Sequence, residues 1–448
     1  MRLTKKFIVS VFLVVVVGAM GFFYSASLIS QKYWQTYFKS VFNHTRHVAQ
    51  VTPVPPDPSD SYINFSAEVY DKIKENYWDK IDDGQLSHLY KLSVEKVLSA
   101  PVTDDPKTKE EVGVTLKNVI RDYDDVKKED FVTKVVDVVL ANLKPPGRSR
   151  LYTSQAEKGL RNTVENRVPS TDLYATLGVP KEALPEKIEQ TYKEKVTELK
   201  SDKSPEAPAK LAQIERAYNT LSKPDAKKNY DTSKVEPTVD YKLLTADIFY
   251  IKLDKFSPQS FDELYKAANS QDPKKTNGPS TLILDLQDNI GGAIDILQYF
   301  LGPFIGPDQY AYEFFHQGNK EPFKTKVGWL ESLVRYKKVV ILTNEKSQSS
   351  AEVMAATLKK YKVGVLVGKP TKGWGTVEQL IPIGTQINPD QKYSIMIVQS
   401  ITLREDGQPI EGHGVDPNVN ITDKNWPTQL MAYFNYPQLV IVLKGLFK

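Results

Sequence analysis

The sequence contains no cysteine, which excludes disulfide bonds, thiol catalysis and cysteine-ligated metal sites. Histidine is also scarce, and the five histidines are His44, His47, His88, His316 and His413. They are scattered, and none forms a helix-spaced pair within a carboxylate motif of the kind that binds zinc. We therefore expect no metal and no cofactor.

A sustained block of basic residues is lacking in the part of the chain that is expected to fold. The formal net charge of +4 is small for a chain of 448 residues. Nucleic-acid binding is therefore not expected. The length itself predicts two or three domains.

A long uncharged run opens the chain. Basic residues within the first six positions precede an apolar stretch from Phe7 to Ile29, which could span the ~30 Å hydrocarbon layer as a helix. Ser25-Ala26-Ser27 offers a cleavage site, but the run exceeds the roughly 7 to 15 apolar residues of a signal peptide. Residues 1–30 are interpreted as a transmembrane anchor, with a signal peptide as the alternative. The preceding charges predict a single-pass membrane protein whose bulk is extracytoplasmic.

Two further segments separate this run from the rest of the chain. Residues 31–61 are polar and include the proline-rich stretch VTPVPPDPSD, which favours an extended linker. Residues 62–168 are predicted to be helical because Phe65, Val69 and Ile73 recur at helical spacing.

Residues 233–424 alternate β-branched runs with helical patterns, which predicts an α/β core. Thr281–Leu286 and Val339–Thr343 read as buried strands, and Ala351–Lys360 has the periodicity of a helix. The segment 303–330 looks rich in loops. Residues 425–448 are predicted to form a C-terminal helical tail, and the interruption of their apolar run by Asn435 and Pro437 argues against a second membrane span.

Three serines lie where the second of these strands passes into the helix. A hydroxyl at Ser347, Ser349 or Ser350 would stand beside the unpaired N–H groups of a helix N-terminus, which can stabilise an oxyanion. The same residues also fit a helix cap, because Glu352 follows Ser349 by three positions as in a capping box. Both interpretations stay open at this point.

Four stretches, in order, carry a resemblance to a known family. They are DLQDNIGG (285–292), NEKSQSSAE (344–352), GKPTKGWGTVE (368–378) and GHGVDP (412–417). Together they resemble the C-terminal processing, or tail-specific, serine peptidases. The resemblance implies a multidomain α/β protein with a ClpP/crotonase-like peptidase core, acting on polypeptides.

The resemblance also assigns expected roles to single residues. It places the nucleophile at Ser349 and the oxyanion N–H groups at Gly292 and Ser350. The position of the family's general-base lysine is Trp374, and that of its orienting glutamine is Glu378. An indole has a donor N–H and no acceptor lone pair, so Trp374 cannot take a proton from serine.

Two functions follow from this substitution. The favoured one is a pseudopeptidase that binds peptides or proteins without efficient cleavage. The alternative is an active serine endopeptidase of envelope proteins, in which Lys372, less plausibly Lys369, or Glu378 serves as a substitute base. A misplacement of ~1 Å can cost on the order of a hundredfold in rate, which favours the first.

Residues 169–232 stand where the family has a PDZ domain, and their pattern is helical. DLYATLGV (172–179), AYNTL (217–221) and Tyr230-Asp231 resemble a J-domain. The His-Pro-Asp tripeptide by which J-domains stimulate DnaK-type chaperones reads Lys200-Ser201-Asp202 here. A DnaK-type partner is therefore not expected, and the module could be a spacer or a protein-binding element.

Overall fold

The computed structural model describes residues 61–448 except 165, 167–171, 203, 205–206, 272–277, 405 and 448. The predicted anchor and the proline-rich linker lie outside the described residues. Within the described ranges, every helix is too short or too polar to cross a bilayer.

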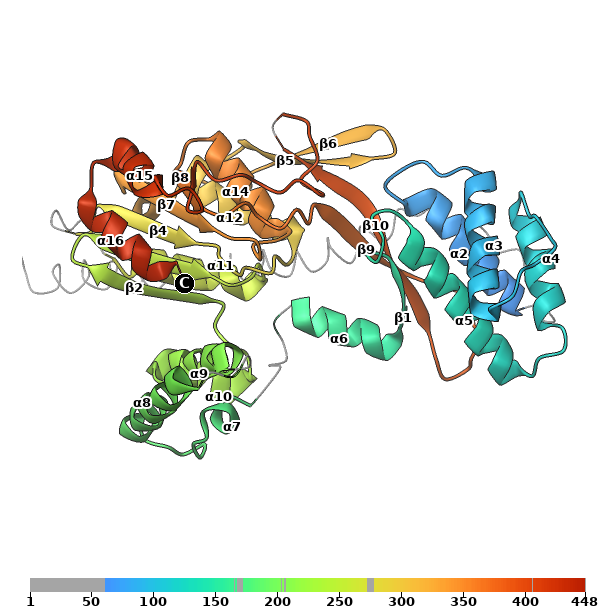
Figure 1. The fold of residues 1–448 in the computed structure, drawn as a ribbon, viewed down its shortest axis with the longest axis horizontal. Helices are drawn as coiled ribbons and strands as arrows, with labels where there is room; N and C mark the ends of the chain where they lie inside the picture. The colour runs from blue at the N-terminus through green and yellow to red at the C-terminus, as the bar shows by residue number, and fades with distance from the viewer. Residues whose placement is uncertain are drawn as a thin grey trace, which may run out of the picture. The chain divides into compact units, whose positions relative to one another are not determined.

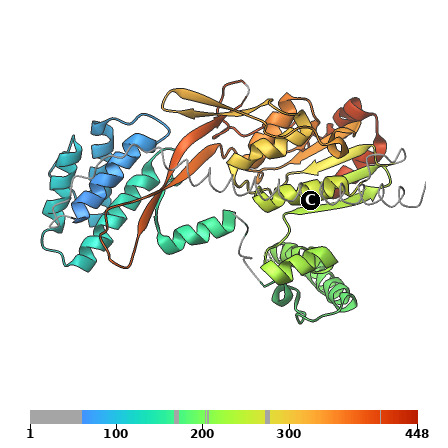
Figure 2. The same cartoon turned by 180° about the vertical axis from the view of Figure 1, so that it is seen from behind.

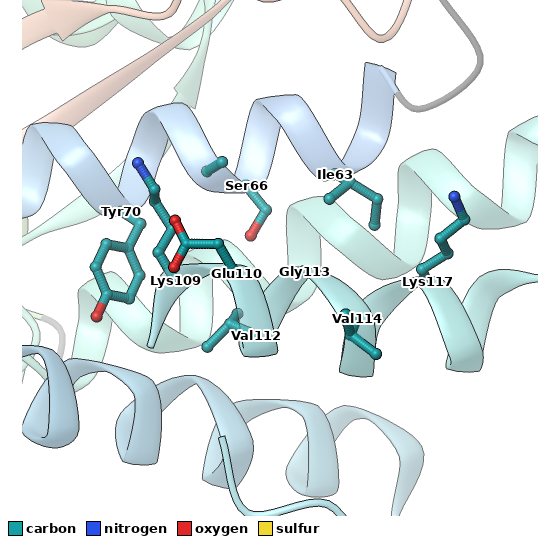
Figure 3. Close-up of a pocket in the computed structure, with 10 residues that line it drawn as sticks. Ile63, Ser66, Tyr70, Lys109, Glu110, Val112, Gly113, Val114 and Lys117 are labelled. Atoms are coloured by element: carbon teal, nitrogen blue, oxygen red, sulfur yellow. The ribbon is translucent and has the colours of Figure 1, made fainter. Parts of the chain in front are cut away.

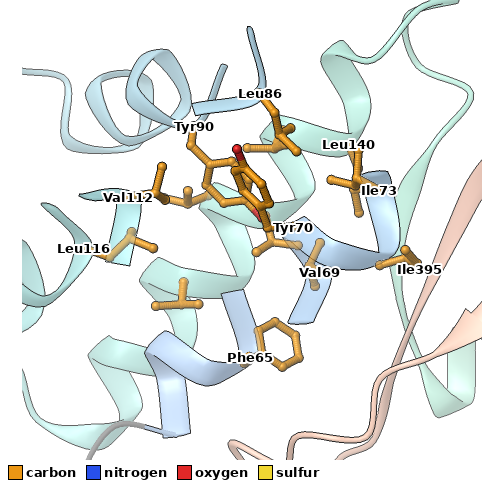
Figure 4. Close-up of a cluster of buried hydrophobic side chains, with 14 of the residues drawn as sticks. Phe65, Val69, Tyr70, Ile73, Leu86, Tyr90, Val112, Leu116, Leu140 and Ile395 are labelled. Atoms are coloured by element: carbon orange, nitrogen blue, oxygen red, sulfur yellow. The ribbon is translucent and has the colours of Figure 1, made fainter. Parts of the chain in front are cut away.

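The N-terminal helical region forms one apolar core that continues into the neighbouring sheet. Its helices are α2 (Ser61–Asn76), α3 (Asp83–Leu98), α4 (Lys109–Ile120) and α5 (Asp125–Asn142). Phe65, Val69 and Ile73 are fully buried, as their helical spacing predicts (Figure 4). Ile395 and Ile397 belong to the same core, so the helices are packed against a strand that also reaches the candidate site.

A cavity of about 330 Å³ lies between α2 and α4 (Figure 3). Gly113, in the interior of α4, lets α2 approach closely beside this cavity, since a Cβ there would meet the Cγ2 of Ile63 at 3.2 Å. The cavity is lined by the helical region alone and contains none of the residues expected in the catalytic site.

In the module that resembles a J-domain, each described secondary-structure element is a helix. After α6 (Ser154–Val164), the module comprises α7 (Leu173–Leu177), α8 (Pro185–Ser201), α9 (Ala207–Leu221) and α10 (Pro224–Ser233). The rings of Tyr192 and Tyr218 stack with centroids 3.9 Å apart, which joins the two long helices. Lys200 and Ser201 end α8 and Asp202 caps it, so the altered tripeptide lies at a helix terminus.

A six-stranded sheet is the centre of the α/β core (Figure 1, and from behind Figure 2). Its order is β11-β8-β7-β4-β3-β2, in which only β2 runs antiparallel to its neighbour. The strands are β2 (Val239–Thr245), β3 (Ile248–Leu253), β4 (Thr281–Asp285), β7 (Lys338–Thr343), β8 (Val365–Gly368) and β11 (Val419–Asn420).

Helices cover this sheet. The C-terminal helices α15 and α16 pack Leu430, Leu439 and Leu443 against sheet residues that include Ile283 and Val340. The helices of the core and tail are α11 (Pro258–Asn269), the 3₁₀ turn η3 (Ile294–Ile296), α12 (Leu297–Ile305), α13 (Glu331–Val334), α14 (Ser350–Lys360), α15 (Trp426–Phe434) and α16 (Pro437–Leu446).

A second sheet corrects one expectation. Its strands are β1 (Arg150–Thr153), β5 (Tyr310–His316), β6 (Asn319–Lys324), β9 (Thr376–Pro382) and β10 (Tyr393–Leu403). The segment 303–330, expected to be mostly loop, contains the hairpin β5–β6. Gln317 and Gly318 both have positive φ, of 48° and 91°, which suits a tight hairpin turn.

The parallel strands β4, β7 and β8 end side by side. Asp285 pairs with Leu342, and Thr343 pairs with Gly368, so the three turns that follow leave the same edge of the sheet. The carboxyl edge of a parallel sheet is where open α/β proteins place their ligand sites. Three of the four motif stretches occupy these turns.

Candidate active site

The serine-rich turn is fixed to the glycine turn by buried hydrogen bonds. The buried hydroxyl of Ser347 donates to the carbonyl oxygen of Leu286 at 2.7 Å. The Gln348 N–H donates to the carbonyl oxygen of Asn289 at 3.0 Å, and the Asn289 side chain accepts from the Gly291 N–H at 2.8 Å. Ser347 therefore has a structural role in holding the two turns together.

Ser349 is in an unusual backbone conformation at the start of α14. Its φ of 57° and ψ of −125° lie outside the regions that residues with a side chain usually adopt. Such strain persists where the surrounding structure imposes it, and it is concentrated at functional sites. A Cβ on Gly291 would lie 2.6 Å from the Ser349 Cβ, so only glycine allows this close approach.

The buried Glu352 joins this turn to the glycine-rich loop. Its Oε2 accepts from the N–H groups of Ser349 at 2.9 Å and Trp374 at 2.7 Å. Its Oε1 accepts from the Thr371 hydroxyl at 2.5 Å and the Gly373 N–H at 2.7 Å. Burial raises the pKa of Glu352 and outweighs these hydrogen bonds, which lower it. The glutamate therefore does cap Ser349, as a capping box predicts, and it also positions the backbone of residue 374.

The two expected oxyanion donors lie together. The Ser350 hydroxyl donates to the Gly292 carbonyl oxygen at 3.0 Å, which brings the serine turn against the glycine turn. Among the described residues, neither the Gly292 N–H nor the Ser350 N–H has a hydrogen-bond partner. Two unpaired donors beside a half-buried hydroxyl are what acyl chemistry requires for its oxyanion.

The backbone of Trp374 lies close to that of Ser349, because the N–H groups of both residues donate to Oε2 of Glu352. Its indole Nε1 donates to Glu378 Oε1 at 3.3 Å. Glu378 also accepts from the Thr376 hydroxyl at 2.5 Å, and burial raises the pKa of its carboxyl. Glu378 lies on β9 and its carboxyl is engaged by the indole.

The two lysines considered as substitute bases have other partners. The exposed Lys372 donates from Nζ to the Gln348 side chain and lies 4.6 Å from the centroid of the Trp374 ring. Lys369 donates from Nζ to Glu345 at 3.0 Å, with both side chains largely exposed. The Nζ atoms of both lysines are therefore hydrogen-bonded to Gln348 and Glu345 rather than to Ser349.

Sequence reasoning missed two residues of the site. Arg148 places its guanidinium carbon 3.4 Å from the centroid of the Trp374 ring, and it is paired with Glu411 at 2.9 Å. Glu411 in turn accepts from the Gly375 N–H at 2.8 Å. Glu411 adjoins the fourth motif stretch, but nothing in the sequence indicated that Arg148 approaches it.

Comparisons with known proteins agree with the motif pattern. Residues 247–421 match the model of Peptidase family S41, and residues 172–231 match the DnaJ domain. The chain is 30% identical over 190 residues to the carboxy-terminal processing protease CtpA of Bacillus subtilis, which covers 42% of this chain and 38% of that protein. It is 25% identical over 208 residues to a carboxy-terminal-processing protease of Bartonella bacilliformis, covering 45% of this chain and 44% of the relative. The matches thus span less than half the length of these curated relatives.

Solved structures to which the chain is similar include the photosystem II D1 C-terminal processing protease. That structure is 14% identical, with a TM-score of 0.46 over 80% of this chain and 93% of its own. A lipoprotein from Streptococcus agalactiae is 15% identical, with a TM-score of 0.43 over 86% of this chain and 99% of its own.

Proposed function

Because the core of this chain, residues 247–421, belongs to Peptidase family S41, we propose that it binds extended polypeptides around Ser349 and cleaves them very slowly or not at all. The family implies a polypeptide ligand. The unpaired N–H groups of Gly292 and Ser350 support binding of a peptide carbonyl at this place.

The main support for inefficient cleavage is the indole at position 374. Its only N–H points to Glu378, and an indole has no lone pair with which to accept the Ser349 proton. In the part of the chain that the structure describes, no lysine amine is hydrogen-bonded to Ser349. A serine hydroxyl without a base is a poor nucleophile.

An active peptidase is a second candidate, favoured by one contact. Lys372 reaches Gln348, the residue directly before Ser349, so a change of side-chain rotamer could move its amine toward the hydroxyl. Glu378 is the other candidate base, and burial raises the pKa of its carboxyl above the usual range, which makes it a stronger proton acceptor.

The test compares residues 61–448 with its Ser349→Ala variant on one unfolded substrate, reduced and carboxymethylated casein. We expect both proteins to bind the substrate, because the backbone donors remain, and neither to cleave it within hours. Casein fragments that appear with the wild type and are absent with Ser349→Ala would establish the active peptidase. Absence of binding by both proteins would contradict the proposed function.

We also propose that residues 1–30 place the protein at a membrane with its bulk outside the cytoplasm. The uncharged run from Phe7 to Ile29 behind basic residues supports this. The full chain is expected in the membrane fraction and accessible to protease added outside the cell, whereas a chain starting at residue 31 should be recovered in the cytoplasm. Recovery of the full chain in the cytoplasm would contradict the proposal.

A further inference from the structure

Arg148 comes from a part of the chain that neither family model matches. It lies between α5 and β1, before the J-domain-like module, whereas the peptidase match begins at residue 247. Its side chain is nevertheless only 15% exposed, and its guanidinium lies on the Trp374 ring at 3.4 Å. Stacking of a guanidinium on an indole is among the stronger cation–π arrangements.

Arg148 also holds the backbone of the same loop. Its Nη2 donates to Glu411 Oε1 at 2.9 Å, and the other oxygen of Glu411 accepts from the Gly375 N–H at 2.8 Å. The Glu411 side chain is 16% exposed, so water screens this pair little. One arginine therefore constrains the side chain of residue 374 directly and the backbone of residue 375 through Glu411.

The opposite constraint on the indole comes from Glu378. The Trp374 Nε1 donates to it at 3.3 Å, and the charge of Arg148 lowers the pKa of this carboxyl against the effect of its burial. The cation thus favours the ionised form of Glu378, which is the better acceptor for the indole N–H. Arg148, Trp374 and Glu378 act as one unit.

Stability alone does not account for this arginine. Its Nη1 is buried and has no hydrogen-bond partner among the described residues. A buried donor without an acceptor destabilises a fold. Proteins keep such unsatisfied groups mainly at functional sites.

We propose that Arg148 is a positioning residue that fixes the indole of Trp374 as a rigid wall of the polypeptide-binding site. The N-terminal helical region thereby completes a site whose other residues lie in the peptidase core. The effect on polypeptide binding rests on the proposed function, whereas the effect on the indole does not.

The experiment separates these two effects. In protein labelled with ¹⁵N at the tryptophan indoles, the Trp374 signal is assigned by its loss in Trp374→Phe. Arg148→Met should shift or broaden this signal and weaken the binding of carboxymethylated casein by about tenfold. Arg148→Lys, which keeps the charge without the planar fork, should restore the affinity in part.

The matched control is Arg150→Met, which removes an arginine two positions away that is paired with Asp137 and largely exposed. It should leave the indole signal and the affinity unchanged. If Arg148→Met does not fold, Glu411→Gln weakens the ion pair between Arg148 and Glu411 while Arg148 is retained. This variant should also shift the Trp374 signal. An unchanged Trp374 signal in the folded variant would overturn the proposal. Lack of casein binding by the wild type would instead contradict the proposed function, while the indole signal would still decide the role of Arg148.

Discussion

Replacing Trp374 with lysine is expected to give the chain a serine-dependent peptidase activity. The backbone of residue 374 is already held by Glu352, which also binds the Ser349 N–H, so an amine here would start from a fixed position. Arg148 and the surrounding protein would lower the pKa of that amine, because a nearby cation and burial both disfavour a second positive charge. General-base catalysis by a positioned group contributes roughly 10²- to 10⁴-fold in rate.

Glu378 should limit the peptidase activity that Trp374→Lys gains. A carboxylate beside the new amine favours its charged form and so raises the pKa of the lysine. Adding Glu378→Gln, which restores the residue expected at this position, removes that carboxylate. We therefore expect Trp374→Lys/Glu378→Gln to be the more active protein, with the rising limb of its pH–rate profile at lower pH.

The measurement is the release of fragments from carboxymethylated casein between about pH 6 and 10, the range over which a lysine with a lowered pKa loses its proton. The control adds Ser349→Ala to the double variant and should abolish the release. If neither lysine variant cleaves in a serine-dependent way, the missing lysine is not what limits cleavage by this site.

The second large effect is expected from Glu352→Ala. The change leaves the N–H groups of Ser349, Gly373 and Trp374 without their acceptor, and an unpaired buried donor costs about 1 to 3 kcal/mol. The variant also removes a carboxyl whose burial is unfavourable and raises its pKa, and this offsets part of the loss of stability. The free energy of unfolding should fall by about 3 kcal/mol, and binding of casein should be lost.

Urea unfolding of residues 61–448 measures this effect. Glu345→Ala is the matched control, because Glu345 lies in the same turn but is exposed, and its ion pair with Lys369 is open to solvent, which predicts a change within about 0.5 kcal/mol. A loss below about 1 kcal/mol in Glu352→Ala would show that the loop and the serine turn are held together by other contacts.

The sequence predicted the parts of the site that depend on local pattern. The β-branched run that ends at Thr343 and the periodic run from Ala351 define a strand and a helix, and Ser349 necessarily falls between them. The structure places Gly292 and Ser350 in contact, as the motif order indicated, while their roles as oxyanion donors stay predictions. The substitute-base roles of Lys372 and Glu378 also stay predictions.

Contacts distant in sequence were not predictable. The approach of Arg148 to Glu411, 263 positions away, depends on how β1 pairs with β10, and no local pattern encodes that pairing. The hairpin β5–β6 was missed because its aromatic and charged residues give a poor alternation, although Gln317-Gly318 is a suitable turn sequence. The register of β10 against β9 shifts at a bulge between Val398 and Ser400, which depends on the pairing of the two strands and not on a local pattern.

The sharing of one Glu352 oxygen by the amides of residues 349 and 374 has a consequence for how this protein could have diverged. The main chain at position 374 is placed by its own amide, whatever group the α-carbon carries. Mutation could therefore exchange a lysine for a tryptophan, or the reverse, without dismantling the scaffold around it. A general base could then be gained or lost at this position by very few substitutions, with the main-chain frame of the site left as it is.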